Sequence, residues 1–134
     1  MKYLLDTNVC IDYLTRRYAS VVGRVQTSSP EDLCLSSVVV AELRYGADKS
    51  QRREENHRTI DILINEIVCV DFDAEAAAVF GRIRWDLERR GEPIGPYDMM
   101  IAAHALSLGL ILVSDNLREL RRIDGLALEN WREA

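Results

Sequence analysis

The sequence predicts an α/β fold in which helices cover both faces of a central parallel β-sheet of about five strands. Five short apolar runs are spread along the chain, and segments with apolar residues at helical spacing separate them. Such alternation favours parallel strands joined by crossover helices. The chain has 134 residues, of which 48% are hydrophobic, so it can bury one core. We therefore expect a single domain over residues 1–134.

The first half of the chain is expected to contribute three strands. The apolar run Tyr3–Leu5 precedes a helical spacing that continues to Val25, where Ser28-Ser29-Pro30 interrupts it. The serine pair at 36–37 provides N-caps for the next helix. Apolar residues at i, i+3, i+4 and i+7 from Ile60 indicate a further helix. Strands are therefore expected at 3–5, 33–35 and 68–70, with helices near 11–25, 36–47 and 60–67.

The second half is expected to hold two more strands. Apolar residues at 76–87 form a helical stripe that Gly91 closes as a C-cap. A proline-containing loop at 93–96 follows, and a helix from Asp98 to Leu108 ends at Gly109. The next apolar run is the most hydrophobic and should lie in the middle of the sheet. The remaining elements are that strand at 110–113, a short helix through 120 and a last strand at 126–128.

Composition excludes several classes of protein. No apolar run approaches the ~18 residues of a membrane span, and the first acid comes too early for the apolar region of a signal peptide. We therefore expect no membrane association and a cytoplasmic location. Cys10, Cys34 and Cys69 are widely spaced, without a Cys-x-x-Cys pair, which indicates buried side chains rather than a zinc site.

The charge distribution says more about partners than the net charge of −5. The negative net charge is weak evidence against a protein that binds nucleic acid by backbone neutralisation alone. Fifteen of the 17 basic residues are arginine, whose planar guanidinium suits phosphate. An acidic protein can still cut RNA if its carboxylates hold divalent metal.

Four acids in separate segments are expected to share one edge of the sheet. Asp6 directly follows the first strand, and Asp115 lies just beyond the strand at 110–113. Glu42 lies early in the helix after the second strand, and Asp98 opens the helix that leads to the strand at 110–113. In a parallel sheet, residues after a strand and residues that open a returning helix share the carboxyl edge, where ligands bind.

Carboxylates that crowd one edge need a cation to offset their repulsion. Oxygen ligands without nearby histidine or thiol select Mg²⁺ or Mn²⁺. Two such ions about 4 Å apart can activate a water and stabilise the leaving oxygen of a phosphodiester. Taken singly, Asp6 or Asp98 could cap a helix, and Glu42 could be a surface residue. The shared edge is what favours a metal site.

Five sequence motifs surround these acids and continue to the end of the chain. They are Leu4–Asn8, Ala41–Ala47, Pro93–Leu106, Leu112–Asn116 and Gly125–Trp131. In order and spacing they resemble the PIN-domain ribonuclease toxins of the VapC type. One motif alone is weakly specific, but the set of five is highly specific.

The resemblance implies a Mg²⁺-dependent endoribonuclease that cuts structured RNA such as tRNA, forms a homodimer and is inhibited by a VapB-type antitoxin. It implies that Asp6 and Asp98 are metal ligands and that Glu42 is a third acid, which ligates metal or orients water. Thr7 and Ser114 match hydroxyl positions beside the metals, although both could equally make loop and cap hydrogen bonds. We also expect an apolar antitoxin helix that places an Arg or Lys near the acids.

The fourth site residue stays open between two neighbours. The family pattern places an acid two residues after the hydroxyl residue that ends the strand at 110–113. Counted from Ser114, that position is Asn116, and Asp115 lies one residue earlier. Asp115 and Asn116 are therefore both candidate catalytic residues.

The histidines are not expected at the acidic edge. His104 lies six residues beyond Asp98 on one helix, about 240° around its axis, and is expected to be a packing or surface residue. His57 lies in a polar run. Without a histidine pair, attack by the substrate's 2′-hydroxyl is disfavoured. Metal-activated water, which leaves a 5′-phosphate and a 3′-hydroxyl, is expected instead.

Two other classes of function are disfavoured by the residues present. Phosphoryl-transfer domains of the receiver or haloacid-dehalogenase type need a lysine near the phosphate, and this chain has only Lys2, at the wrong edge, and Lys49. A catalytically inactive binding module is disfavoured because Asp6, Glu42 and Asp98 are all present. The alternative that stays open is a PIN-fold nuclease that acts on other RNA or on DNA, outside a toxin–antitoxin system.

Overall fold

Five short strands form one parallel sheet in the structure, a computed structural model that describes residues 1–133. The strands are β1 (Tyr3–Leu5), β2 (Leu33–Ser36), β3 (Val68–Val70), β4 (Ile111–Val113) and β5 (Leu128–Glu129). Their order is β3-β2-β1-β4-β5, and every neighbouring pair is parallel. The predicted α/β class and strand number are confirmed.

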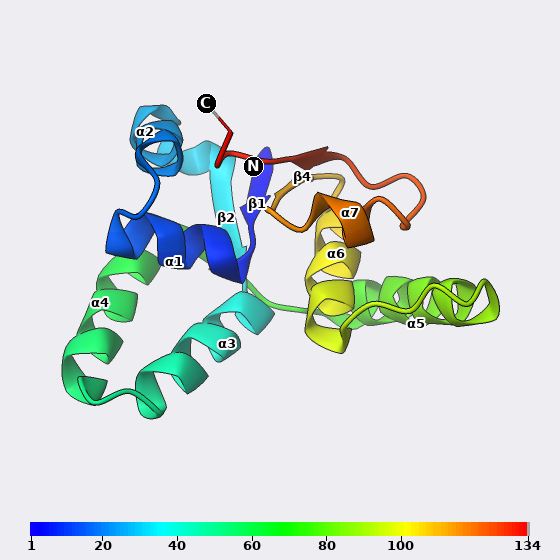
Figure 1. Cartoon of the computed structure of the whole chain (residues 1–134), viewed down its shortest axis with the longest axis horizontal. Helices are drawn as coiled ribbons and strands as arrows, with labels where there is room; N and C mark the ends of the chain where they lie inside the picture. The colour runs from blue at the N-terminus through cyan, green and yellow to red at the C-terminus, as the bar shows by residue number, and fades with distance from the viewer. Residues whose placement is uncertain (134) are drawn as a thin grey trace.

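Helices surround this sheet, as the sequence predicts. They are α1 (Thr7–Thr15), α2 (Ala19–Thr27), α3 (Ser37–Asp48), α4 (Arg53–Glu66), α5 (Ala74–Arg89), α6 (Pro96–Leu108) and α7 (Leu117–Leu120), with a 3₁₀ turn at Pro30–Asp32. The chain moves outward from β1 to β3 and then crosses back to β4. Right-handed connections therefore place α1 to α4 on one face and α5 to α7 on the other. In Figure 1, α1 to α4 lie mainly to the left of β1 and α5 to α7 to its right.

Several boundaries differ from those predicted, and α4 begins at Arg53 rather than near Ile60. The helix expected to continue to Val25 is two helices, because Arg16 adopts a φ of 55° and ends α1. Glycine is the usual residue in this left-handed conformation, so an arginine gives no sequence signal. The last strand covers 128–129 rather than 126–128, after Gly125 turns the chain at a φ of 81°.

The core includes the middle strand β1 and its neighbour β4. Leu4 and Leu5 of β1, and Leu112 and Val113 of β4, are at most 1% exposed. Strands covered on both faces read as unbroken apolar runs, which is why both were recognisable in the sequence. The strand expected in the middle is β4, which lies inside the sheet between β1 and β5. Within residues 1–133, no helix has both the length and the apolar character needed to cross a bilayer.

Candidate active site

The five predicted site residues gather around the carboxyl ends of β1 and β4. Asp6 is the residue after β1, and Asp115 and Asn116 lie between β4 and α7. Glu42 is in the second turn of α3, and Asp98 is the third residue of α6. The structure brings these side chains close enough for the acids to affect one another's pKa. We call this edge the acidic rim.

Asp6 is the most buried acid of the group. It is 8% exposed, its backbone N–H donates to the carbonyl of Val113, and its Oδ1 accepts the backbone N–H of Val9 at 2.9 Å. Burial raises the pKa of Asp6 to about 7, and the negative charges of Asp115 and Asp98 act in the same direction. The cap bond from Val9 and a hydrogen bond from a nearby serine hydroxyl oppose this rise only in part. Asp6 therefore both caps α1 and lacks a compensating cation.

The pKa of Asp98, like that of Asp6, is raised by its surroundings. Burial raises its pKa, and the charges of Glu42, Glu119 and Asp115 raise it further. The side-chain amide of Asn116 donates to Asp98 Oδ2 at 3.4 Å, which favours the ionised form. No basic side chain within residues 1–133 forms an ion pair with Asp6 or Asp98.

Hydroxyl groups orient the other polar side chains of the rim. Thr7 donates its hydroxyl to Glu42 Oε1 at 2.6 Å, so α1 fixes the direction of an acid that α3 supplies. The Ser114 hydroxyl accepts the backbone N–H of Asn116 at 3.0 Å and is buried. Ser114 therefore makes the loop hydrogen bond that was one of its two predicted roles, whereas Thr7 bonds to a site acid rather than to the loop or helix cap.

Glu119 is an acid of the rim that sequence reasoning missed. The Asn116 amide nitrogen lies 3.2 Å from Glu119 Oε2 and also donates to Asp98. Asn116 therefore does not supply the fourth acid of the family pattern; its amide connects Asp98 with Glu119. The signal was present in the sequence: Glu119 lies three residues after Asn116 where a short helix was expected, and residues at that spacing share one face of a helix.

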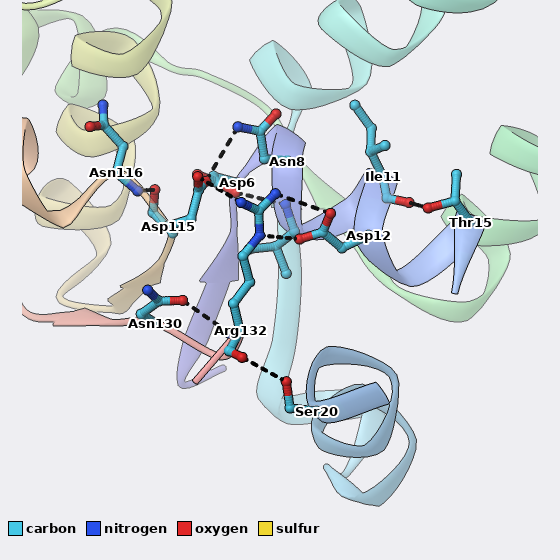
Figure 2. Close-up of polar contacts among 12 residues, drawn as sticks. Asp6, Asn8, Ile11, Asp12, Thr15, Ser20, Asp115, Asn116, Asn130 and Arg132 are labelled. Atoms are coloured by element: carbon cyan, nitrogen blue, oxygen red, sulfur yellow. Dashed lines mark hydrogen bonds and ion pairs between the residues drawn. The ribbon is translucent and has the colours of Figure 1, made fainter. Parts of the chain in front are cut away.

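Asp115 has a different environment, because a cation from the end of the chain reaches it. Arg132 Nη1 donates to Asp115 Oδ2 at 3.0 Å, and Asn8 Nδ2 lies 3.3 Å from Asp115 Oδ1. Figure 2 shows the Arg132 guanidinium between Asp115 and Asp12. The same guanidinium donates to both oxygens of Asp12, at 2.6 and 3.1 Å, although Asp12 is only 1% exposed.

The Arg132–Asp12–Asp115 cluster was not predicted. Arg132 also lies over the ring of Tyr18, with its guanidinium carbon 4.6 Å from the ring centroid, and its carbonyl accepts the hydroxyl of Ser20. Arg132 and Asp12 are 120 positions apart, so no local pattern in the sequence relates them. The three side chains form a cluster in which one guanidinium serves two carboxylates, beside acids that have no cationic partner within residues 1–133.

Neither histidine belongs to the rim. His104 is 1% exposed, and its Nδ1 lies 2.8 Å from the hydroxyl of Ser36, which confirms the prediction of a packing residue. Burial lowers the pKa of His104, so it packs in its neutral form. His57 lies on α4 between Arg44 and Asp48. A mechanism that relies on two histidines has no geometric basis here.

The donor set of the rim fits a hard divalent cation. Around Asp6 and Asp98 the ionisable groups are carboxylates, and the pKa values of these two acids are raised by burial and by the charges of neighbouring acids. A cation bound between such groups replaces the missing counter-charge, and oxygen-only ligands select Mg²⁺ or Mn²⁺. Within residues 1–133, no three His, Cys, Asp or Glu side chains are arranged as a ready-made metal cage. The metal-ligand roles of Asp6 and Asp98 stay predictions.

Comparison with known proteins places the rim in a family context. The PIN domain family model matches residues 3–126. The tRNA(fMet)-specific endonuclease VapC of Shigella flexneri is 46% identical, with 98% of each chain covered, and Ribonuclease VapC2 of Haemophilus influenzae is 44% identical over the same shares. A chain of the DNA-bound VapBC structure from Salmonella typhimurium has a TM-score of 0.92 at 41% identity, with 98% of both chains covered. The matched residues include all the acids of the rim, whereas Arg132 lies beyond residue 126.

Proposed function

Since this chain belongs to the PIN domain family, and within it to the ribonucleases of the VapC type, we propose that it is a metal-dependent endoribonuclease and the toxin of a type II toxin–antitoxin system. One observation carries the metal-dependent part of this proposal. Asp6 and Asp98 lie at the same rim, both with raised pKa values and neither with a cationic partner. Such a pair is unfavourable for the protein unless a cation binds there.

We assign separate roles to the residues of the rim. Asp6 and Asp98 would hold Mg²⁺, with Mn²⁺ as an alternative, and the bound metal would supply a Lewis acid and an activated water. The hydroxyl of Thr7 fixes Glu42, which is thereby positioned to orient the attacking water or to accept its proton. The amide of Asn116 holds the Asp98 carboxylate in place. Attack by external water on the phosphodiester leaves a 5′-phosphate and a 3′-hydroxyl.

The proposed substrate is a structured RNA, with tRNA the first class to test. The support is similarity: the Shigella flexneri relative, 46% identical over nearly the whole chain, is named for its specificity for tRNA(fMet). The proposed partner is a VapB-type antitoxin, because a solved relative at 41% identity is a VapBC structure bound to DNA. We also propose a homodimer, since two-fold pairs are the commonest symmetric assembly.

The proposal is tested with the purified chain and a set of tRNAs. Cleavage should require Mg²⁺ or Mn²⁺, should stop in EDTA, and should leave ends that accept ligation as 5′-phosphates. Asp124→Asn is the matched control for rim variants, because Asp124 is an exposed acid that precedes β5 and so lies away from the carboxyl edge. Cyclic-phosphate ends that form in EDTA would overturn the metal mechanism. Cleavage of DNA in preference to RNA would overturn the substrate class.

A further inference from the structure

Two exposed tyrosines lie directly beside the acids of the rim. Tyr45 is 66% exposed and lies one helical turn after Glu42 on α3. Tyr97 is 59% exposed and immediately precedes Asp98 on α6. With Ala41 and Glu42, the two rings line a cavity of about 380 Å³. Each tyrosine therefore lies on the same helix as a predicted catalytic acid and close to it in sequence.

Packing within the chain does not account for these rings. Neither ring stacks on another aromatic side chain within residues 1–133, and neither hydroxyl has a hydrogen-bond partner there. A buried tyrosine usually satisfies its hydroxyl and buries its ring. By contrast, Tyr3 packs edge-on against Trp131, and Tyr13 donates its hydroxyl to a glutamate. Tyr45 and Tyr97 are thus aromatic surface left available next to the site.

A cation accompanies one of these rings. Lys49, the residue after α3, places its ammonium 4.8 Å from the centroid of the Tyr45 ring. Lys49 makes no ion pair in the part of the chain that the structure describes. Aromatic rings beside a positive side chain are the combination that binds unpaired nucleotides, because bases stack on the rings and the cation contacts phosphate.

We propose that Tyr45, Tyr97 and Lys49 form a subsite for an unpaired RNA nucleotide next to the scissile phosphate. Its base stacks on the tyrosine rings in the cavity, and Lys49 contacts its backbone phosphate. This inference rests on the proposed ribonuclease function and adds a preference to it. A base can enter the cavity only when it is unstacked from its neighbours, so the subsite favours loops and single strands over duplex RNA. Stacking accepts any base, so the preference is for RNA shape rather than for one base.

The test measures RNA binding without cleavage. Affinity for a fluorescent hairpin RNA is measured by anisotropy in EDTA, with wild type, Tyr45→Ala, Tyr97→Ala and Lys49→Met. Each tyrosine variant should bind about 5- to 150-fold more weakly, the range expected for loss of one base stack. Tyr45→Phe and Tyr97→Phe should bind like wild type, because they keep the ring. Trp85→Ala is the matched control, since Trp85 is 67% exposed on α5 and lines a different cavity.

An abasic RNA separates stacking from general loss of affinity. Removing the base at one loop position should weaken binding to wild type, and the same change should have little further effect on Tyr45→Ala. In Mg²⁺, the tyrosine variants should raise KM for the hairpin more than they lower kcat, as expected for loss of ground-state binding.

The outcomes distinguish the subsite from the proposed function. If wild type cuts RNA and the alanine variants bind and cut like it, the subsite is wrong and the ribonuclease function stands. If wild type cuts no RNA in Mg²⁺ or Mn²⁺, the proposed function fails, whatever the binding results. If the alanine variants keep their RNA affinity but lose affinity for the antitoxin, the surface serves a protein partner and the proposal is overturned.

Discussion

The two groups of acids at the carboxyl edge differ in how their charge is balanced. Asp12 and Asp115 share Arg132, which donates to both carboxylates from the end of the chain (Figure 2). Asp6 and Asp98 have no cationic partner within residues 1–133, and their pKa values are raised. The protein therefore carries its own cation for one group and, within residues 1–133, none for the other, which is the observation behind the proposed metal site. This difference separates acids held in an ion-pair cluster from acids that we propose to be metal ligands.

The most decisive test removes one carboxylate from the group without a cation. Asp6→Asn and Asp98→Asn should each lower the rate of RNA cleavage by more than about 1000-fold, because metal catalysis contributes several kcal/mol and each 1.36 kcal/mol is a factor of ten. Asn can still cap α1 at position 6, so the fold is kept. Cleavage by single-turnover kinetics in Mg²⁺ is the measurement, with Asp124→Asn expected to match wild type. Metal-dependent cleavage at the wild-type rate by either rim variant would contradict the assignment.

The second test breaks the group that has its own cation. Arg132→Ala leaves Asp12 buried without a partner, and loss of one member of a buried ion pair costs about 3–5 kcal/mol. The free energy of unfolding in urea should fall by that amount. The control is Arg84→Ala, whose pair with Glu88 is half exposed on both sides and should contribute about 1 kcal/mol or less. Equal losses in the two variants would mean that Arg132 is only a surface residue.

The third test concerns pH, because an acid with a raised pKa destabilises the folded state once it ionises. Asp6 has a pKa of about 7 in the folded state, above the ordinary aspartate pKa of about 3.9, so the folded state holds its proton more tightly. The stability that this proton provides is complete below about pH 4 and is lost as the pH rises through 7. The loss is on the order of 2–4 kcal/mol without metal.

The variant Asp6→Asn isolates the contribution of Asp6 ionisation to the pH dependence of stability. The variant should lack this part of the pH dependence and should unfold at a higher temperature than wild type at pH 8 in EDTA. Adding Mg²⁺ at pH 8 should raise the melting temperature of wild type and should have less effect on the variant. A wild type that is as stable as the variant at pH 8 in EDTA would show that Asp6 carries no such repulsion.

The sequence predicted the site residues that adjoin a recognisable strand or helix. It did not predict contacts between residues that lie far apart in the chain. Asp6 and Asp98 could be placed because each adjoins a recognisable strand or helix, and the parallel topology brings those ends together. The strand order itself depends on packing between segments that no local pattern records. The cluster around Arg132 could not be found for the same reason, since its partner Asp12 lies 120 positions away.

The smallest expected effect on cleavage decides whether Asp115 or Asn116 is the fourth site residue. Asp115 already has an ion-pair partner in Arg132, whereas Asn116 connects Asp98 with Glu119. Asp115→Asn should therefore lower cleavage by less than about tenfold, a cost near 1 kcal/mol, because it removes no metal ligand. Asn116→Ala and Glu119→Gln should each have the larger effect, since both alter the surroundings of Asp98. The reverse order in single-turnover rates, with Asp115→Asn the most damaging, would make Asp115 the fourth acid and would mean that Arg132 releases it when metal and RNA bind.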